Sequence, residues 1–272
     1  MKKIIIIPVS YCFPFFKDSA SERFRCDWLL PYLPADKYNG HQKLDDYDVI
    51  IYQKAHSLEM LNLAKKYKNK KVQIYDNTDP DFIFNDLKEF VNCMDFVTTS
   101  TQATAKGFEI YGVPSYVIPD RHELSYYREI KVHRQIDNPL FVWFGYADNF
   151  VRIEPLLPIL KGHKFELKAV CEQPVEYGNF VAWNKNTINK EIIEGDIVLN
   201  LPDNYGYKSN NKTTTAWCLG MPVVEKITQI FEFLECEDRV KEAEKRLKQV
   251  QEEYNIKRSA EEILYLIEQY KK

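Results

Sequence analysis

The sequence predicts an α/β protein with two Rossmann-like domains, and three observations support that fold class. Short runs of apolar, β-branched residues recur along the 272 residues, which is typical of strands buried on both faces of a parallel sheet. Segments with helical periodicity follow most of these runs, so strands alternate with helices. The alternation stops in a polar stretch, residues 120–138, and restarts at Leu140. We therefore predict domains at residues 1–133 and 134–272.

The first half of the chain contains five predicted strands. They cover residues 3–9, 48–52, 71–75, 96–99 and 115–118. Ser19-Ala20-Ser21-Glu22 has the form of a capping box, in which a serine and a glutamate satisfy the first free N–H groups of a helix. Ser57 and either Ser100 or Thr101 are placed to cap two further helices. This half therefore reads as consecutive βαβ units.

The second half repeats the pattern and ends in helices. Its predicted strands cover residues 140–144, 165–170, 180–183, 196–201 and 222–225. A helix is expected over residues 239–254, and a second capping box, Ser259-Ala260-Glu261-Glu262, predicts a last helix over residues 259–270.

Composition excludes several classes of protein. The net charge of −3 provides no general field for binding nucleic acid. No segment reaches the apolar length of a membrane span, and Pro8 interrupts the apolar start too early for a signal peptide. The six cysteines lack C-x-x-C spacing, which favours reduced thiols over zinc ligands or disulfides. We expect a cytoplasmic protein without a stable membrane span.

One stretch of the second half has the features of an anion site. A predicted strand ends at Leu201, a polar loop follows, and a short helix ends at Gly220. The loop carries Gly206, Lys208 and Lys212 beside serine and asparagine residues. Free N–H groups at a helix start attract anions, and lysines add positive charge. The alternative interpretation is a simple turn with solvated lysines.

The same stretch resembles the nucleotide-sugar loop of GT-B glycosyltransferases, of the family 4-like or group 1 type. The resemblance rests on Leu219-Gly220-Met221-Pro222-Val223-Val224 and on Lys208-Ser209-Asn210-Asn211-Lys212, with weaker similarity in residues 47–54, 98–101, 141–146 and 195–200. It implies two Rossmann-like domains with a cleft between them and a last helix that returns to the N-terminal domain. It also implies a hexosyltransferase-like enzyme that moves a sugar from a nucleotide donor to a hydroxyl acceptor and needs neither metal nor cofactor.

The predicted donor-binding residues lie in loops at the carboxyl ends of the second set of strands, where α/β proteins bind ligands. They are Gly145, Trp183, Asn184, Tyr207, Lys208, Ser209, Asn211, Lys212 and Thr213. Lysines and helix N–H groups would hold the diphosphate and stabilise the charge that it gains as a leaving group. Trp183 would flank the base, although a place in the core is an equal alternative.

The predicted acceptor side is at the ends of the first set of strands. Asp76, directly after a strand, is our candidate for the catalytic base that takes a proton from the acceptor hydroxyl. Other candidates near this edge are Arg23, Arg25, Lys54, His56 and Asp79. Asp, Asn and Pro are also ordinary turn residues, so the aspartates could merely turn the chain.

The sequence departs from the family pattern and leaves alternatives open. Two glutamates that flank the loop in the commonest retaining enzymes are replaced by Tyr207 and Thr215, so the stereochemical course stays open. Asp79-Pro80-Asp81 could instead be the metal-binding pair of a single-domain GT-A enzyme. A non-catalytic binder of a nucleotide or another phosphorylated ligand is a further alternative. So is a phage-type enzyme that glycosylates a modified DNA base. The acceptor could thus be a glycan, a small molecule or such a base.

Overall fold

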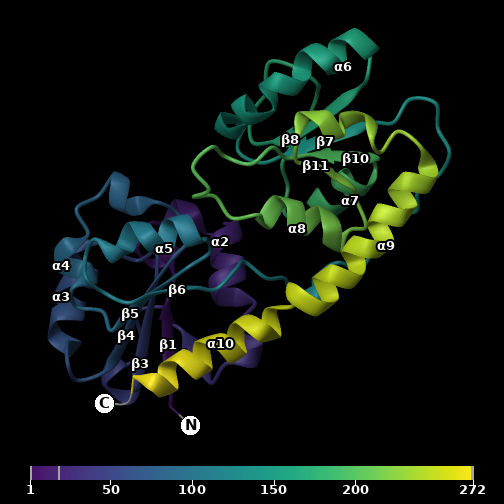
Figure 1. The fold of residues 1–272 in the computed structure, drawn as a ribbon. Coiled ribbons are helices and arrows are strands. Elements are labelled where there is room, and N and C mark those ends of the chain that lie inside the picture. Colours follow the sequence, from purple (N-terminus) through teal and green to yellow (C-terminus); the bar gives the residue numbers. More distant parts are fainter. Residues whose placement is uncertain (1, 18, 271–272) are drawn as a thin grey trace. The chain divides into compact units, whose positions relative to one another are not determined.

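The structure, a computed structural model, describes residues 2–17 and 19–270. The chain divides into two compact units, and Figure 1 shows the ribbon coloured along the sequence. Unit 1 comprises Met1–Glu123, Tyr205–Ser209 and Asn255–Lys272, and unit 2 comprises Leu124–Asn204 and Asn210–Tyr254. Each unit contains a parallel sheet with helices packed on it, so the predicted α/β class with two Rossmann-like domains is confirmed.

The described part of unit 1 contains a six-stranded sheet in the order β2-β1-β3-β4-β5-β6. Its strands are β1 (Ile4–Ile7), β2 (Ala35–Lys37), β3 (Val49–Gln53), β4 (Val72–Asn77), β5 (Phe96–Thr99) and β6 (Ser115–Val117). All neighbours pair in parallel, so their carboxyl ends lie along one edge. The sequence did not predict β2, because three partly polar residues carry no apolar run. The predicted strand over residues 71–75 extends two residues further, to Asn77.

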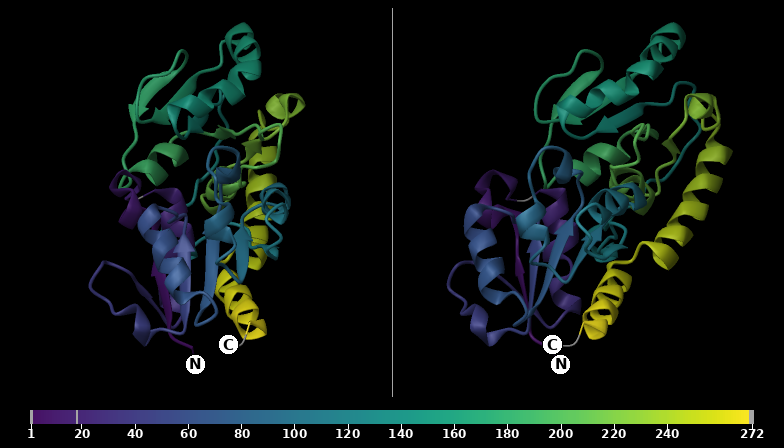
Figure 2. Two further views of the ribbon diagram at one scale, coloured as in Figure 1. Left: turned by 90° about the vertical axis from the view of Figure 1, so that its left-hand side faces the viewer. Right: turned by 60° about the vertical axis from the view of Figure 1, so that its left-hand side comes forward.

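Helices cover both faces of this sheet, as Figures 1 and 2 show. One face packs against α3 (Leu58–Tyr67), α4 (Lys88–Val91) and α5 (Gln102–Glu109). The other face packs against α10 (Ile256–Gln269) and the segment that follows α2 (Ala20–Glu22), a π-helix at Arg23–Asp27. Alternate residues of a strand point to opposite faces, and so Ile5 and Ile7 join the first core while Ile4 and Ile6 join the second.

Most of the predicted helix starts are found in the structure. Ser19 accepts a hydrogen bond from the N–H of Glu22, Ser57 from that of Met60, and Thr101 from that of Thr104. The last helix begins earlier than predicted, with Asn255 as its cap. The predicted start at Ser259 is wrong because that side chain is buried inside the helix, where it accepts a hydrogen bond from Arg121 at 3.2 Å.

In unit 2 the described residues form a five-stranded parallel sheet in the order β11-β10-β7-β8-β9. Its strands are β7 (Phe141–Phe144), β8 (Leu167–Cys171), β9 (Asn179–Ala182), β10 (Ile197–Leu199) and β11 (Val223–Val224). Its helices are α6 (Leu157–His163), α7 (Ile188–Ile193), α8 (Asn211–Cys218) and α9 (Cys236–Glu253). The core contains Trp143, which is 1% exposed and meets Phe150 edge-on.

Within the described ranges, we find no helix that combines the length and the apolar character needed to cross a bilayer.

Candidate functional site

Polar side chains gather at the carboxyl ends of β3, β4 and β5 in unit 1. The sequence folds them together because parallel neighbours end at one edge: Gln53 pairs in register with Asp76, and Asp76 with Thr98. Three groups of side chains can be distinguished there: an Arg25 network, a lysine–aspartate cluster and a His56 cluster.

The Arg25 network consists of Arg25, Asp76, Thr98 and Asp120. Arg25 is 2% exposed, and its Nε donates to both carboxylate oxygens of Asp76 at 3.1 Å. Its Nη1 donates to the carbonyl oxygen of Ile118 at 2.7 Å and lies 3.8 Å from Oδ1 of Asp120. The hydroxyl of Thr98 donates to Asp76 at 2.6 Å. Asp76, our predicted base, is therefore occupied by a guanidinium and a hydroxyl; its catalytic role stays a prediction.

Asp120 is a member of this network that the sequence did not single out. It is 1% exposed, and its Oδ1 accepts no hydrogen bond from the residues that the structure describes. Burial raises the pKa of Asp120, while Arg25 and a hydrogen bond from Ser209 oppose the rise. The only signal in the sequence was its place just beyond a predicted strand.

The lysine–aspartate cluster consists of Lys54, Asp79 and Lys208. Lys54 donates to Oδ2 of Asp79, and Lys208 donates to Oδ1 at 2.8 Å. Burial alone would raise the pKa of Asp79, but the two ammonium groups outweigh burial and lower this pKa to about 2. Asp79 is therefore a firmly ionised carboxylate and a weak base.

The segment Tyr205–Ser209 packs on unit 1 through several contacts. The carbonyl oxygen of Tyr207 accepts a hydrogen bond from Thr104 at 3.2 Å, and the ring of Tyr207 lies 5.9 Å from that of Phe82. Lys208 donates a hydrogen bond to Asp79, and Ser209 donates one to Asp120. One predicted donor-binding residue, Lys208, thus contacts a predicted acceptor-side residue, Asp79. The donor role of Tyr207, Lys208 and Ser209 stays a prediction.

The His56 cluster consists of His56, Tyr75, Asn77 and Asp81. Nδ1 of His56 lies 3.0 Å from the carbonyl oxygen of Lys54 and 3.1 Å from the hydroxyl of Tyr75. Asn77 donates to that hydroxyl at 3.0 Å and to Oδ2 of Asp81 at 3.1 Å. Burial lowers the pKa of His56, and the negative charge of Asp81 opposes this shift. Burial also raises the pKa of Asp81. At neutral pH the imidazole is consequently uncharged.

A separate site in unit 2, the Lys212 site, consists of Trp143, Gly145 and Lys212. Gly145 follows β7 with φ of +149°, and a Cβ atom there would lie 2.1 Å from Nζ of Lys212. The same Nζ lies 5.0 Å from the centre of the Trp143 ring, within the range of a cation–π contact. Gly145 is therefore required for the lysine to approach the strand end closely.

The first turn of α8 supports the same site. Asn210, at its N-cap position, makes no side-chain cap and donates instead to the hydroxyl of Tyr254 at 3.2 Å. Thr213 is 1% exposed; its hydroxyl accepts from Asn200 and donates to Glu225, both at 2.9 Å. Asn211 and Lys212 begin the helix, so uncapped N–H groups and an ammonium group occur together.

The remaining predicted residues, Trp183, Asn184 and Arg23, are members of none of these groups. Trp183 is 40% exposed just beyond the edge strand β9. The side-chain oxygen of Asn184 accepts a hydrogen bond from the N–H of Asn186, and its carbonyl oxygen accepts one from the N–H of Ile188, both at 2.9 Å. Asn184 therefore turns the chain into α7. Arg23 lies over the ring of Trp28 at 5.9 Å. No contact that we observe tests their proposed ligand roles.

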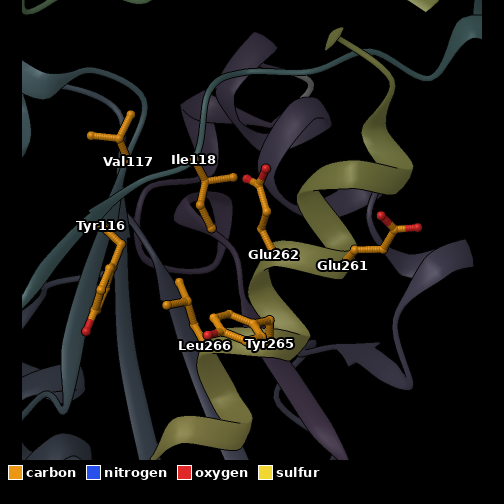
Figure 3. A pocket seen from close by; sticks show the side chains of 7 residues that line it. All are labelled: Tyr116, Val117, Ile118, Glu261, Glu262, Tyr265 and Leu266. Carbon is orange, nitrogen blue, oxygen red and sulfur yellow. The ribbon is translucent and has the colours of Figure 1, made fainter. Parts of the chain in front are cut away.

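Two surface pockets are lined by other residues, although Ile118, whose carbonyl oxygen accepts from Arg25, lines the first of them. A pocket of about 400 Å³ in unit 1 is formed by α10 and by β6 with the residue that follows it, as Figure 3 shows. A pocket of about 320 Å³ in unit 2 involves Lys131 and Asp196, which form an ion pair at 2.9 Å. None of the predicted site residues lines either pocket.

Among residues 2–17 and 19–270, no group of three or more His, Cys, Asp or Glu side chains is arranged to hold a metal ion. Asp79 and Asp81 are the pair considered for a metal. Asp79 contacts Lys54 and Lys208, and Asp81 contacts Asn77.

These two units define a protein of the GT-B fold, as comparison with solved structures shows. A glycosyltransferase from Rickettsia africae aligns with a TM-score of 0.63 over 98% of both chains, at 11% identity. The catalytic domain of starch synthase IV from Arabidopsis thaliana, bound to ADP and acarbose, aligns with a TM-score of 0.55 over 82% of this chain and 73% of its own, at 9% identity.

A third structure, of accessory secretory proteins 1, 2 and 3 from Streptococcus pneumoniae, aligns with a TM-score of 0.53 at 11% identity over 83% of this chain. Our chain spans only 54% of that protein. No protein-family model and no curated protein sequence matches the chain. The fold of two sheets excludes the single-domain GT-A alternative.

Proposed function

We propose that this chain is a glycosyltransferase that moves a hexose from a nucleotide-sugar donor to a hydroxyl acceptor without a metal ion. The observation that carries the proposal is the Lys212 site, where a lysine from the uncapped first turn of α8 brings its ammonium group to Gly145. The GT-B fold supports it, and the starch synthase structure with this fold holds ADP, a nucleoside diphosphate.

The Lys212 site suits a diphosphate on physical grounds. A diphosphate carries about two negative charges and accepts hydrogen bonds from N–H groups. When the bond between the sugar and the phosphate breaks, the leaving diphosphate gains charge, and prearranged positive groups stabilise that charge. The Thr213 hydroxyl, held by Asn200 and Glu225, fixes the start of α8 in place. We propose that unit 2 binds the donor in this way.

We propose that the acceptor hydroxyl binds at the carboxyl edge of the sheet in unit 1. The buried Lys54 and the partly exposed His56 and Asp79 gather there. Tyr207, Lys208 and Ser209 remain proposed donor ligands that would exchange their contacts in unit 1 for the phosphates.

Thermal denaturation with UDP, GDP, CDP, ADP and TDP, each measured once with EDTA and once with manganese, tests the donor site. A nucleotide at a hundredfold excess over its dissociation constant should stabilise the protein by roughly 2.7 kcal/mol. Lys212→Ala should weaken binding about 10- to 100-fold, because hydrogen bonds to charged groups contribute roughly 1.5–3 kcal/mol. Gly145→Ala should weaken it too, by displacing the ammonium group.

Lys248→Ala is the matched control, because that lysine of α9 is 76% exposed. It should leave nucleotide affinity unchanged. Absence of a shift with all five nucleotides, or a Lys212→Ala variant that binds as tightly as the wild type, would remove the basis for this proposal. A shift that requires manganese would contradict metal independence.

A further inference from the structure

The histidine His56 has a free nitrogen at the carboxyl edge of unit 1. Its Nδ1 lies 3.0 Å from the carbonyl oxygen of Lys54. A carbonyl oxygen only accepts hydrogen bonds, so we infer that Nδ1 carries the proton and that the Tyr75 hydroxyl, 3.1 Å away, accepts from it as well. In a neutral imidazole the other nitrogen, Nε2, then holds a lone pair. Nε2 makes no hydrogen bond with any residue that the structure describes.

The surroundings hold this ring in place. The Tyr75 ring meets it edge-on at 6.1 Å, and the Phe13 ring lies 5.8 Å away. The charged groups that act on it are Asp81, which favours the imidazolium form, and Lys54, which opposes that form. Asn77 fixes Asp81 through a hydrogen bond at 3.1 Å.

The aspartates near this edge are poorer bases than His56. Asp76 accepts hydrogen bonds from Arg25 and Thr98, which occupy its lone pairs. Asp79 lies between two ammonium groups. A general base works best when its pKa is near the working pH, and the imidazole fits that requirement better than a carboxylate between two cations.

We propose that His56 is the general base of the transfer reaction, with Asp81 as the charge that stabilises its protonated form. The proposal rests on the proposed function and names the group that accepts the proton. The acceptor oxygen loses its proton to Nε2 and forms a bond to the anomeric carbon. The bond from that carbon to the phosphate oxygen breaks, and the diphosphate leaves with the electron pair. A single displacement of this kind inverts the anomeric centre.

Nitrogen-15 NMR of the histidine side chains tests the geometry without turnover. His56→Gln assigns the signals, and we expect a neutral ring protonated on Nδ1 at pH 7.5. Asp81→Asn should lower the pKa of His56, because it removes the charge that favours the imidazolium. A ring protonated on Nε2, or an imidazolium at pH 7.5, would overturn the proposal even if nucleotides bind.

Turnover tests the role itself. The probe is the glucose ester of whichever nucleoside diphosphate stabilises the protein, with water and a panel of methyl glycosides as acceptors. His56→Gln should lower kcat about 10²- to 10⁴-fold and leave the dissociation constant of the nucleotide unchanged. His41→Gln, at an exposed histidine of the same unit, is the matched control and should keep full activity. The wild-type rate should fall at acidic pH as His56 becomes protonated.

The outcomes separate the two proposals. An active wild type with an equally active His56→Gln variant, or a product with retained configuration, overturns the role of His56 and leaves the transferase standing. A wild type that binds nucleotide but transfers sugar to none of these acceptors, water included, overturns both the role and the transferase. A wild type that binds no nucleotide overturns the proposed donor site and the transfer role together.

Discussion

Replacing Arg25 should destabilise unit 1 far more than a typical substitution. Arg25→Met keeps most of the side-chain volume but removes the hydrogen bonds to Asp76 and to the carbonyl oxygen of Ile118. It leaves Asp76 and Asp120, which are 4% and 1% exposed, without their cation. Removing one partner of a buried ion pair costs roughly 3–5 kcal/mol, a large part of the usual stability of a domain.

Hydrogen exchange measured by mass spectrometry is the suitable assay, because it reports on each unit separately. A loss of 3–5 kcal/mol should accelerate exchange in peptides from β4 roughly 10²- to 10⁴-fold when exchange follows the opening equilibrium. Peptides from β7 in unit 2 are the internal control. Arg258→Met, at an exposed arginine of α10, is the control variant and should change little.

Acid should partly rescue the Arg25→Met variant. An unpaired buried carboxyl has a folded-state pKa above its unfolded value, so protonation favours the folded form and the deficit shrinks as the pH falls. Asp76→Asn in the same background should also recover stability, because it removes one of the two buried charges. A variant with wild-type exchange, or one that neither acid nor Asp76→Asn rescues, would refute this account of the network.

Two further predictions follow from the same unit. Asp79→Asn should lower the urea midpoint at pH 7 by an amount equivalent to roughly 1–2 kcal/mol, because the pKa of Asp79 is lowered from 3.8 to about 2. A group whose pKa is lowered in the folded state stabilises the protein at pH values above its unfolded pKa, and this stabilisation is lost as the pH falls through the folded pKa. The difference in stability between Asp79→Asn and the wild type should therefore vanish between about pH 4 and pH 2. A difference that does not change with pH would contradict this prediction. Gly107→Ala should lower the melting temperature, because its Cβ would lie 2.0 Å from the ring of Phe82, and overpacking costs roughly 1–3 kcal/mol, against about 1 kcal/mol of helix propensity. Phe82→Leu should relieve the clash, and a raised melting temperature in Gly107→Ala alone would refute it.

The sequence was a good guide wherever a feature depends on neighbouring residues. Runs of β-branched residues predicted the buried strands. Ser19, Ser57 and Thr101 cap helices at the positions that the local sequence pattern predicted. Parallel pairing follows from the alternation of strands and helices, and with it the gathering of polar residues at the strand ends. The position of Lys212 beside Gly145 is consistent with the expected anion site.

Features that depend on distant residues could not be predicted in this way. Lys208 lies 129 positions from Asp79, with which it pairs, and no local pattern links the two. The segment Tyr205–Ser209 follows a strand of unit 2 in the sequence, yet its contacts are in unit 1. Likewise, the tautomer of His56 depends on a backbone carbonyl oxygen, which a sequence does not display.

The two-residue extension of β4 explains why Asp76 and the His56 cluster are separate. Because the strand continues to Asn77, Asp76 points to the same face as Ile74, where Arg25 and the segment Arg23–Asp27 lie. Tyr75 and Asn77 point to the opposite face, toward His56. Alternation along one strand thus assigns a buried ion pair to one face and a histidine with a free nitrogen to the other. Substitutions at Arg25 should therefore change stability, whereas substitutions at His56 should change turnover.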